Sequence, residues 1–448
     1  PNEKADWINQ RDGLFDSLIP LAPEKKFSLN AQSVFSTYVI GVATNRDAWV
    51  SGFSKDKVAS NMLSMINFYN HSIGIETYSE DKTKISWTRG LRNDLSKGLK
   101  YDFDEAEFVT TTYRPFTKQH LYYHRPFIEC PGLWQRIYPS TQYNNIVIAV
   151  SGVGQQKPFS PFITDNISDL QVVDKAQYFP LFFYDENKNR ENSLFDDEET
   201  NRYIRRDGIT DWILKEVRNR FGGSRIITKE HIFYYVYGLL HSKQYRERFA
   251  DDLKKSLPRI PIVDNVQDFM AFYKAGKELA DIHLNYEQGI NVQTTGHDGD
   301  YIFFAEMPMF AHRFFGVKVI GDIDIWQNEW ANDTYQHFAV EKMKFAKVRD
   351  ENGKLISDKT RIIYNGHITI ENIPLKAYEY IVNGKSAIEW IMERYTVTID
   401  KASQIKNDPN DWSKEHEQPR YILDLLLSVI ILSCRTVDIV NSLPTFRV

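Results

Sequence analysis

Residues Tyr113–Phe127 read YRPFTKQHLYYHRPF, a stretch in which arginine, lysine and histidine alternate with aromatic rings. One interpretation is a half-buried pair of β-strands whose polar face is solvated. The other is a surface that contacts phosphates and reads bases, because arginine pairs bidentately with guanine and also stacks on rings. The stretch by itself leaves both interpretations open.

The composition is that of a globular protein with many aromatic residues. Its 448 residues allow two or three packed units, or one large unit with lobes. Hydrophobic residues make up 42% and charged residues 26%, which is ordinary, whereas the aromatic share of 14% is high. This share suits a β-rich protein with large contact surfaces, and it also suits a carbohydrate-binding module.

The net charge of −5 argues against a uniformly basic nucleic-acid coat protein. It does not exclude DNA binding, because the charge of one face matters more than the sum. Charge is segregated along the chain: residues 165–200 are acidic and residues 201–260 are basic. A local basic surface can therefore exist within an acidic protein.

Motifs for catalysis or metal binding are missing from the sequence. Two cysteines, Cys130 and Cys434, are too few for a disulfide framework, a zinc ribbon or an iron–sulfur site. The P-loop, HExxH, GxSxG and GxGxxG patterns do not occur, and the glycine-rich SGVGQQKPF at Ser151–Phe159 lacks the Lys-Ser/Thr pair of a P-loop. We therefore expect no catalytic centre, cofactor or metal ion in this chain.

The sequence predicts a cytoplasmic protein without a membrane segment. The first twenty residues are polar, and no stretch of about eighteen apolar residues occurs. The longest candidate, Ile422–Leu432, contains Asp424 and is expected to be a core helix. Because the chain begins with Pro1 rather than methionine, we expect it to be part of a longer polypeptide.

Periodicity predicts an α/β (α+β) fold whose first region, residues 1–190, is a mainly β lobe. A helix is predicted at Lys55–Tyr69, where Val58, Met62 and Met65 recur at spacings of three and four. The strands expected here cover residues 34–43, 144–150 and 178–184. The polar run at 185–201 is expected to be a solvated loop that ends the lobe.

The second region, residues 201–290, is predicted to be a helical lobe. Thr228 can cap one helix, and Ser242 can cap the next, which the PRIP sequence at Pro258–Pro261 ends. A third helix is expected at Val266–Leu284. We expect these amphipathic helices to hold the lobes together.

The third region, residues 291–448, is predicted to be a small α/β unit. Asn365-Gly366 lies between alternating runs and indicates a hairpin, and residues 351–353 indicate another just before it, so a β-meander is expected. Ser386 and Glu389 have the spacing of a capping box. A terminal helix from Tyr421 to about Asn441 should be buried.

Candidate DNA contacts follow from side-chain chemistry. Arginine and lysine contact phosphates or guanine, glutamine reads adenine edges, and aromatic rings stack. The candidates are Arg114, Lys118, His120, Tyr123, Arg125, Gln135, Arg136, Gln155, Gln156, Lys157, Arg202, Arg205 and Arg206. The cluster at 202–206 can equally be the salt-bridged start of a helix beside the acidic run.

The order of motifs resembles the C-terminal target-recognition region of Type ISP restriction-modification enzymes, and parts are similar to Type IIG specificity domains. The landmarks span nearly the whole chain. They are DWINQR (Asp6–Arg11), TNRDAWV (Thr44–Val50), YRPFTKQHLYY (Tyr113–Tyr123), PFITDNISDL through YFPLFFY (Pro161–Tyr184), ITKEHIFYYVYGLLHSKQYRERFADDLKKSLPRIP (Ile227–Pro261), AGKELADIHLNYE (Ala275–Glu287), AYEYIVNGKSAIEWIMERY (Ala377–Tyr395) and NDPNDW (Asn407–Trp412).

This resemblance implies a module that reads an asymmetric site in double-stranded DNA, and we expect the lobe of residues 1–190 to be the DNA-recognition lobe that makes most of the contacts. In that family a nuclease, a helicase-type ATPase, a coupler and an adenine-N6 methyltransferase precede the region, so S-adenosylmethionine, ATP and Mg²⁺ are expected only in those upstream domains. Base flipping is expected of the methyltransferase, because the target amino group is unreachable in the stack. One departure is the long segment between LNYE and VEKMKF (Val340–Phe345), which suggests a specificity insertion or a docking lobe.

Two rival functions stay open at this point. The first is a structural docking module that joins the methyltransferase and motor domains and touches DNA only incidentally. The second is an aromatic carbohydrate binder or enzyme, which would need a cleft that pairs two carboxylates with exposed rings. Nothing in the sequence nominates such a pair.

Overall fold

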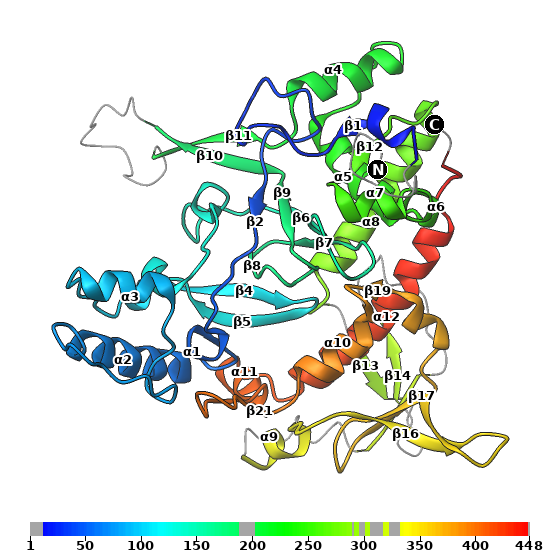
Figure 1. Cartoon of the computed structure of the whole chain (residues 1–448). Coiled ribbons are helices and arrows are strands. Elements are labelled where there is room, and N and C mark those ends of the chain that lie inside the picture. The colour runs from blue at the N-terminus through cyan, green and yellow to red at the C-terminus, as the bar shows by residue number, and fades with distance from the viewer. Residues whose placement is uncertain are drawn as a thin grey trace, which may run out of the picture.

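Two four-stranded sheets lie next to one another in the middle of the computed structural model (Figure 1). The structure describes residues 12–187, 202–288, 291–294, 301–304, 317–321 and 332–446. The first sheet has the order β2–β9–β6–β7 and is antiparallel throughout. Its strands are β2 (Val39–Ile40), β9 (Gln177–Pro180), β6 (Val147–Val150) and β7 (Pro161–Thr164). All residues of β6 and β7 are buried, which explains their continuous apolar sequence.

The second sheet has the order β3–β5–β4–β8 and contains the aromatic and basic stretch. Its strands are β3 (Ser51–Gly52), β5 (Thr117–Tyr122), β4 (Phe108–Arg114) and β8 (Ile167–Ser168). β4 and β8 pair in parallel, and the other pairs are antiparallel. Tyr113–Tyr122 is thus a half-buried strand pair, and the stretch ends in a 3-10 turn, η3 (Arg125–Phe127).

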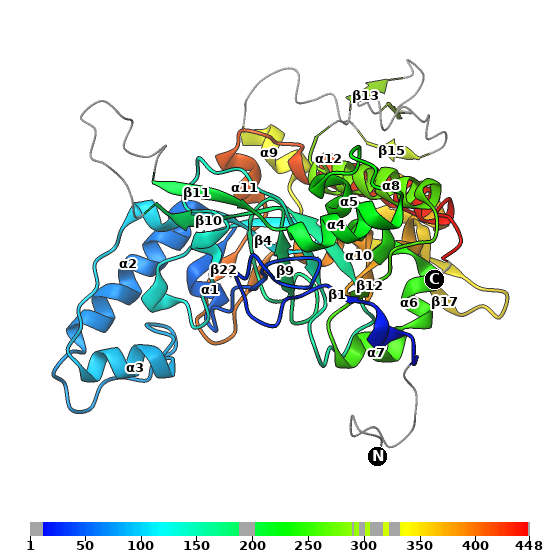
Figure 2. The same ribbon diagram turned by 90° about the horizontal axis from the view of Figure 1, so that it is seen from above.

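Helices α2 (Lys55–His71) and α3 (Arg89–Ser96) lie together at one end of the molecule (Figure 2). The helix predicted at 55–69 is confirmed, and its stripe of Val58, Met62, Met65 and Tyr69 is buried. The Ser54 side chain accepts a hydrogen bond from the backbone N–H of Lys57 and begins this helix. Both helices stay close in sequence and space to β3–β5–β4–β8.

The predicted strand at 178–184 is wrong, because the chain changes sheets there. β9 ends at Pro180, and β10 (Phe182–Glu186) pairs instead with β11 (Tyr203–Asp207). Leu181 between them donates to the Ile146 carbonyl and accepts from the Gly208 amide. The strand expected at 34–43 shrinks to Val39–Ile40. Most of the loop expected at 185–201 lies outside the described residues.

Helices dominate residues 211–284, as predicted. They are α4 (Asp211–Arg220), α5 (Lys229–His241), α6 (Lys243–Arg248), α7 (Ala250–Lys255) and α8 (Val266–Leu284). Thr228 and Ser242 cap α5 and α6 as expected. The single helix expected after Ser242 is divided at Phe249, whose ψ of 22° leaves the helical region.

The C-terminal region contains the predicted meander. β16 (Lys344–Arg349), β17 (Leu355–Ile363) and β18 (Thr369–Glu371) form consecutive antiparallel hairpins, and β15 (Lys318–Ile320) joins beside β18. The remaining helices are α1 (Asp47–Val50), α9 (Asn332–Phe338), α10 (Ala387–Arg394), α11 (Asn410–Glu415) and α12 (Tyr421–Asn441). The capping box of Ser386 and Glu389 is present, and α12 is mostly buried. The short antiparallel pairs are β1 (Ile19–Pro20) with β12 (Arg259–Ile260), β13 (Asn291–Thr294) with β14 (Tyr301–Phe304), β19 (Ile381–Val382) with β20 (Lys385–Ser386), and β21 (Thr398–Ile399) with β22 (Lys406–Asn407).

The α/β fold class is confirmed. The division of the chain into the regions 1–190, 201–290 and 291–448 stays a prediction. The β10–β11 hairpin and the β1–β12 pair both cross the first of these boundaries. No helix among the described residues is long and apolar enough to cross a membrane. The same residues contain no cluster of three or more potential metal ligands.

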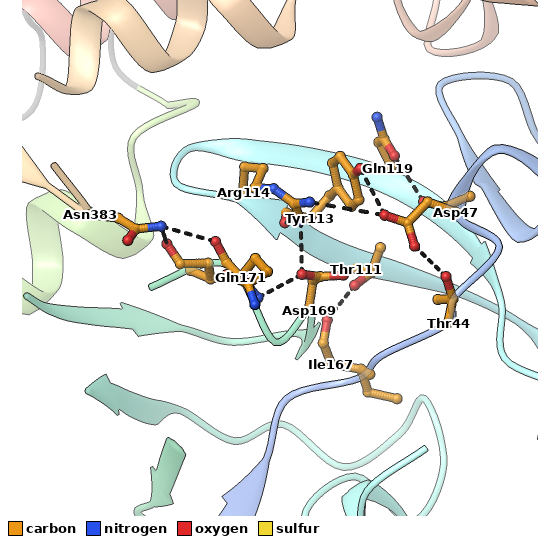
Figure 3. A network of polar contacts seen from close by, with 12 residues as sticks. Thr44, Asp47, Thr111, Tyr113, Arg114, Gln119, Ile167, Asp169, Gln171 and Asn383 are labelled. Atoms are coloured by element: carbon orange, nitrogen blue, oxygen red, sulfur yellow. Dashed lines mark hydrogen bonds and ion pairs between the residues drawn. The ribbon is translucent and has the colours of Figure 1, made fainter. Parts of the chain in front are cut away.

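A buried polar network around Arg114 connects the two central sheets (Figure 3). Arg114, the last residue of β4, donates from Nη1 to Asp169 Oδ1 at 2.8 Å, and its Nη2 lies 3.9 Å from Asp47 Oδ2. The Tyr113 hydroxyl donates to the same Asp47 oxygen at 3.0 Å. The Asp169 carbonyl in turn accepts from the hydroxyl of Tyr178 in β9, at 2.6 Å.

Asp169 is held tightly in this network although burial opposes its charge. Its carboxylate also accepts a hydrogen bond from the backbone N–H of Gln171 at 2.6 Å. Burial raises the pKa of Asp169 to about 6, and the nearby Arg114 opposes that rise. The Gln171 carbonyl accepts from the Asn383 side chain at 3.2 Å, so the network reaches the C-terminal region.

We expect Arg114→Met to destabilise the protein strongly. It leaves the Asp169 carboxylate buried without its cation, which typically costs about 3–5 kcal/mol. Without Arg114 the pKa of Asp169 rises further. A group whose pKa is raised on folding loses its contribution to stability as pH increases through that pKa. Urea unfolding should therefore show a larger loss at pH 8 than at pH 5, and equal losses would contradict this account.

Helices α5 and α8 approach closely through two glycines. A Cβ atom on Gly276 would lie 1.8 Å from the Tyr234 carbonyl oxygen, and one on Gly238 would lie 2.3 Å from the Phe272 carbonyl oxygen. Both contacts are far below van der Waals distance and involve backbone atoms. The helices can pack at this distance only because neither position carries a side chain.

Gly276→Ala should lower the free energy of unfolding by about 1–3 kcal/mol, because the added methyl group forces the two helices apart. The matched control is Lys277→Ala on the exposed face of the same helix, which should change stability little. Thermal unfolding of both variants measures the difference. A Gly276→Ala protein as stable as the control would disprove the close contact.

Candidate nucleic-acid interface

An open groove of about 1700 Å³ lies between the start of α3, the edge of β4 and the start of β10. Its wall includes Thr88–Gly90 and residues 106–110, 123–126, 128–129, 138–141 and 143–146. In Figure 1, α3 and the β10–β11 hairpin project on the same side of the central sheets. Residues at the start of α3 and at the start of β10 line the groove. Three of the predicted contacts, Tyr123, Arg125 and Gln135, line it.

Arg125 is exposed at the groove on the short turn η3. Among the described residues its side chain has no hydrogen-bond or ion-pair partner. The turn is anchored by Phe127, which is fully buried against the Tyr101 ring, with centroids 5.5 Å apart. The backbone at Arg125 is therefore held in place, while its guanidinium group is available to bind a ligand.

Gln135 is held in the same way on the turn η4 (Trp134–Arg136). The preceding Trp134 is fully buried, and its indole N–H donates to the Ile40 carbonyl at 3.1 Å. The neighbouring loop is fixed by Asn145, whose amide donates to the Phe182 carbonyl at 2.6 Å. The Gln135 side chain is exposed and makes no hydrogen bond within the described residues.

Arginines in β11 and directly before it lie beside this groove. Arg205 is exposed, and its guanidinium carbon lies 4.4 Å from the ring centroid of Phe182, a residue of the groove wall. Arg202 is also exposed and lies 5.3 Å from the ring of Tyr203. Arg206 differs from both, because it lies within 3.5 Å of Asp185.

Several predicted contacts are instead used inside the protein. Arg114 belongs to the buried network, Lys118 pairs with Glu287, and Arg136 pairs with Asp185 while lying 3.5 Å from the ring of Phe27. Tyr123 is buried and donates to the Pro131 carbonyl at 2.6 Å. The geometry thus gives each of these residues a partner within the protein.

His120 also has an internal partner. Its Nε2 lies 3.1 Å from Glu415 of α11, and its ring lies 4.8 Å from that of Trp412. Burial lowers the pKa of His120, with Glu415 opposing the shift. The histidine therefore connects β5 to the C-terminal region rather than projecting into the groove.

The glutamines and lysine at 155–157 belong to a different surface. Gln155 is buried, and within the described part of the chain both polar atoms of its side-chain amide lack a hydrogen-bond partner. Gln156 and Lys157 are exposed, and Lys157 lies 5.6 Å from the ring of Trp390 in α10. The structure therefore does not bring these three residues to the groove around Arg125 and Gln135.

The groove has mixed charge. Arg89 and Arg125 line it together with Asp94, Glu107, Glu129 and Asp165. Carboxylates would repel phosphates but can accept hydrogen bonds from cytosine amino groups. Arg89 was absent from the sequence-based candidates because it lies outside the aromatic stretch, although Thr88-Arg89-Gly90 has the pattern of a capped helix start.

Comparison with known proteins places the chain in a family. The model of the Type ISP C-terminal specificity domain matches residues 33–425. No curated protein matches the chain significantly. The resemblance inferred from the motif order is therefore confirmed by the family match.

Three similar solved structures cover 100% of this chain. The ATP-dependent Type ISP restriction-modification enzyme LlaBIII bound to DNA has a TM-score of 0.79 and 36% identity, and 25% of it is matched. A nuclease-deletion mutant of the Type ISP enzyme LlaGI with a DNA substrate mimic has a TM-score of 0.76 and 35% identity, with 36% matched. The DrdV–DNA complex has a TM-score of 0.78 and 26% identity, with 40% matched.

The chain thus spans well under half the length of each of these three proteins. Its fold is similar to theirs over its whole length. Since the family model also covers residues 33–425, the chain belongs to the Type ISP C-terminal specificity domain family.

Proposed function

We propose that this chain recognises a specific sequence in double-stranded DNA through the groove between α3, β4 and β10. The observation that carries the proposal is that Arg125 and Gln135 are exposed on two anchored turns of one groove and have no side-chain partner among the described residues. Family membership supports it, as do the solved structures, each of which contains DNA or a DNA mimic. Rigid anchors favour selective binding, because less conformational freedom is lost on association.

Each exposed residue has a chemical role in this proposal. Arg125 can pair bidentately with guanine, and Gln135 can pair bidentately with adenine. Arg202 and Arg205 supply phosphate contacts that position the protein without reading sequence. Gln156 and Lys157, on the second surface, are weaker candidates because they lie outside the groove wall.

The same proposal places the chain in a longer restriction-modification polypeptide. There it would direct an adenine-N6 methyltransferase and a helicase-nuclease to an asymmetric DNA site in the cytoplasm. S-adenosylmethionine, ATP and Mg²⁺ would be bound by those other domains. The description of LlaBIII as ATP-dependent is consistent with this arrangement.

One observation favours the alternative function of domain docking. The β16–β17 hairpin exposes Val348, Leu355 and Ile356, and Val348 and Ile356 are directly paired across the strands. Exposed apolar residues of this kind can contact another domain. This surface is separate from the groove, so the two functions are compatible within one chain.

The test is selection of bound duplexes from a randomised pool, followed by the same selection with variants. Arg125→Ala should relax the preference at a guanine, and Gln135→Ala should relax it at an adenine, each at a cost of about 1–3 kcal/mol. Gln418→Ala is the matched control, an exposed glutamine that does not line the groove, and it should leave the motif unchanged. If the native chain enriches no motif, or if only the control changes it, the proposal is wrong.

A further inference from the structure

The start of α3 has unpaired donors at the groove. The Thr88 hydroxyl caps the helix by accepting from the Leu91 amide. The preceding amides, those of Arg89 and Gly90, have no hydrogen-bond partner among the described residues. Both residues are exposed and line the groove. The N-terminus of a helix attracts anions because its free N–H groups and its dipole point outward.

A buried arginine lies directly behind this helix start. Arg46 is only 4% exposed, and its Nη2 donates to the Thr88 hydroxyl at 2.6 Å. Its Nε and Nη1 have no hydrogen-bond partner among the residues that the structure describes. Within the described part of the chain, no carboxylate lies within ion-pair distance of its guanidinium group. Burial lowers the pKa of Arg46 to about 10, with Glu129 opposing the shift, so the group remains charged at neutral pH.

An uncompensated buried cation is costly, and an anion placed nearby would offset that cost. The helix start in front of Arg46 is the position that an anion can reach from the groove. The flexible Arg89 side chain, exposed and without a partner in the described structure, adds a second positive charge there. Arg46 contacts Thr88, while Arg89 and Gly90 line the groove, so both charges and the free amides belong to the same helix start.

We propose that the start of α3, with Arg89 at its surface and Arg46 behind it, binds one backbone phosphate of DNA. This inference rests on the proposed function and adds a positioning contact to it. α3 packs against η3, so a phosphate held there would set the position of DNA relative to Arg125. The contact would fix register and would not itself read sequence.

Glu129 is an acidic group beside the free amides and opposes phosphate binding. Its Oε2 lies 3.8 Å from the position that a Cβ of Gly90 would take, close to the free amides. In the absence of DNA the carboxylate therefore occupies part of the space in which the phosphate would bind. Because Glu129 is exposed, its side chain can rotate away when DNA arrives.

The test measures equilibrium binding of the 448-residue chain to its selected duplex and to a scrambled duplex, over a series of salt concentrations. Arg89→Ala should weaken binding to both duplexes about tenfold at low salt. For this variant, the slope of log affinity against log salt concentration should become shallower by about 0.9, the value for one phosphate contact. Glu129→Gln should tighten binding to both duplexes.

Arg225→Ala is the matched control, since Arg225 is an exposed, unpaired arginine in the described loop between α4 and α5 and does not line the groove. Equal affinities and salt slopes for Arg89→Ala and Arg225→Ala would overturn the inference. A changed target motif in Arg89→Ala would also overturn it, because it would indicate a base contact.

The inference and the proposed function can fail separately. A retained motif with no effect of Arg89→Ala on the salt slope rejects only the phosphate site. A shallower slope without any enriched motif rejects sequence recognition and supports the phosphate site. Absence of any DNA binding by the native chain rejects both.

Discussion

The ion pair between Arg114 and Asp169 is the interaction on which the arrangement of the central sheets depends. It joins the end of β4 to the segment that follows β8, and the Asp169 carbonyl extends the connection to Tyr178 of β9. A buried pair of this kind adds little net stability compared with an apolar contact. It gives geometric specificity instead, because one arrangement of the sheets satisfies the guanidinium, the carboxylate and the Tyr113 hydroxyl together.

The groove beside these sheets combines anchored backbone with free side chains. Phe127 and Trp134 are fully buried, whereas Arg125 and Gln135, close to them in sequence, are exposed and unpaired in the described structure. This alternation of buried and exposed side chains is suited to selective recognition, because the side chains that would contact bases are held in position before the ligand binds. The mixed charge of the groove suits base edges as well as phosphates, since carboxylates accept from cytosine.

Local features of the fold were predictable from the sequence. The helix at 55–69, the caps at Thr228 and Ser242, the capping box at Ser386 and the hairpin at Asn365-Gly366 all depend on residues close together in the chain. The strand at 178–184 was predicted wrongly because its interruption at Leu181 depends on hydrogen bonds to Ile146 and Gly208. The sequence around Leu181 does not indicate hydrogen bonds to residues that far away in the chain.

The sequence by itself determined the element types, most helix ends and, through the order of motifs, the family. The tertiary structure decided which cationic side chains are free to bind a ligand. Arg114, Arg136 and Lys118 meet carboxylates that lie 55, 49 and 169 residues away in the chain. Arg125 meets none among the described residues. Composition and spacing cannot separate these cases, because an ion pair depends on distance in space and a side chain's availability depends on what the fold places beside it.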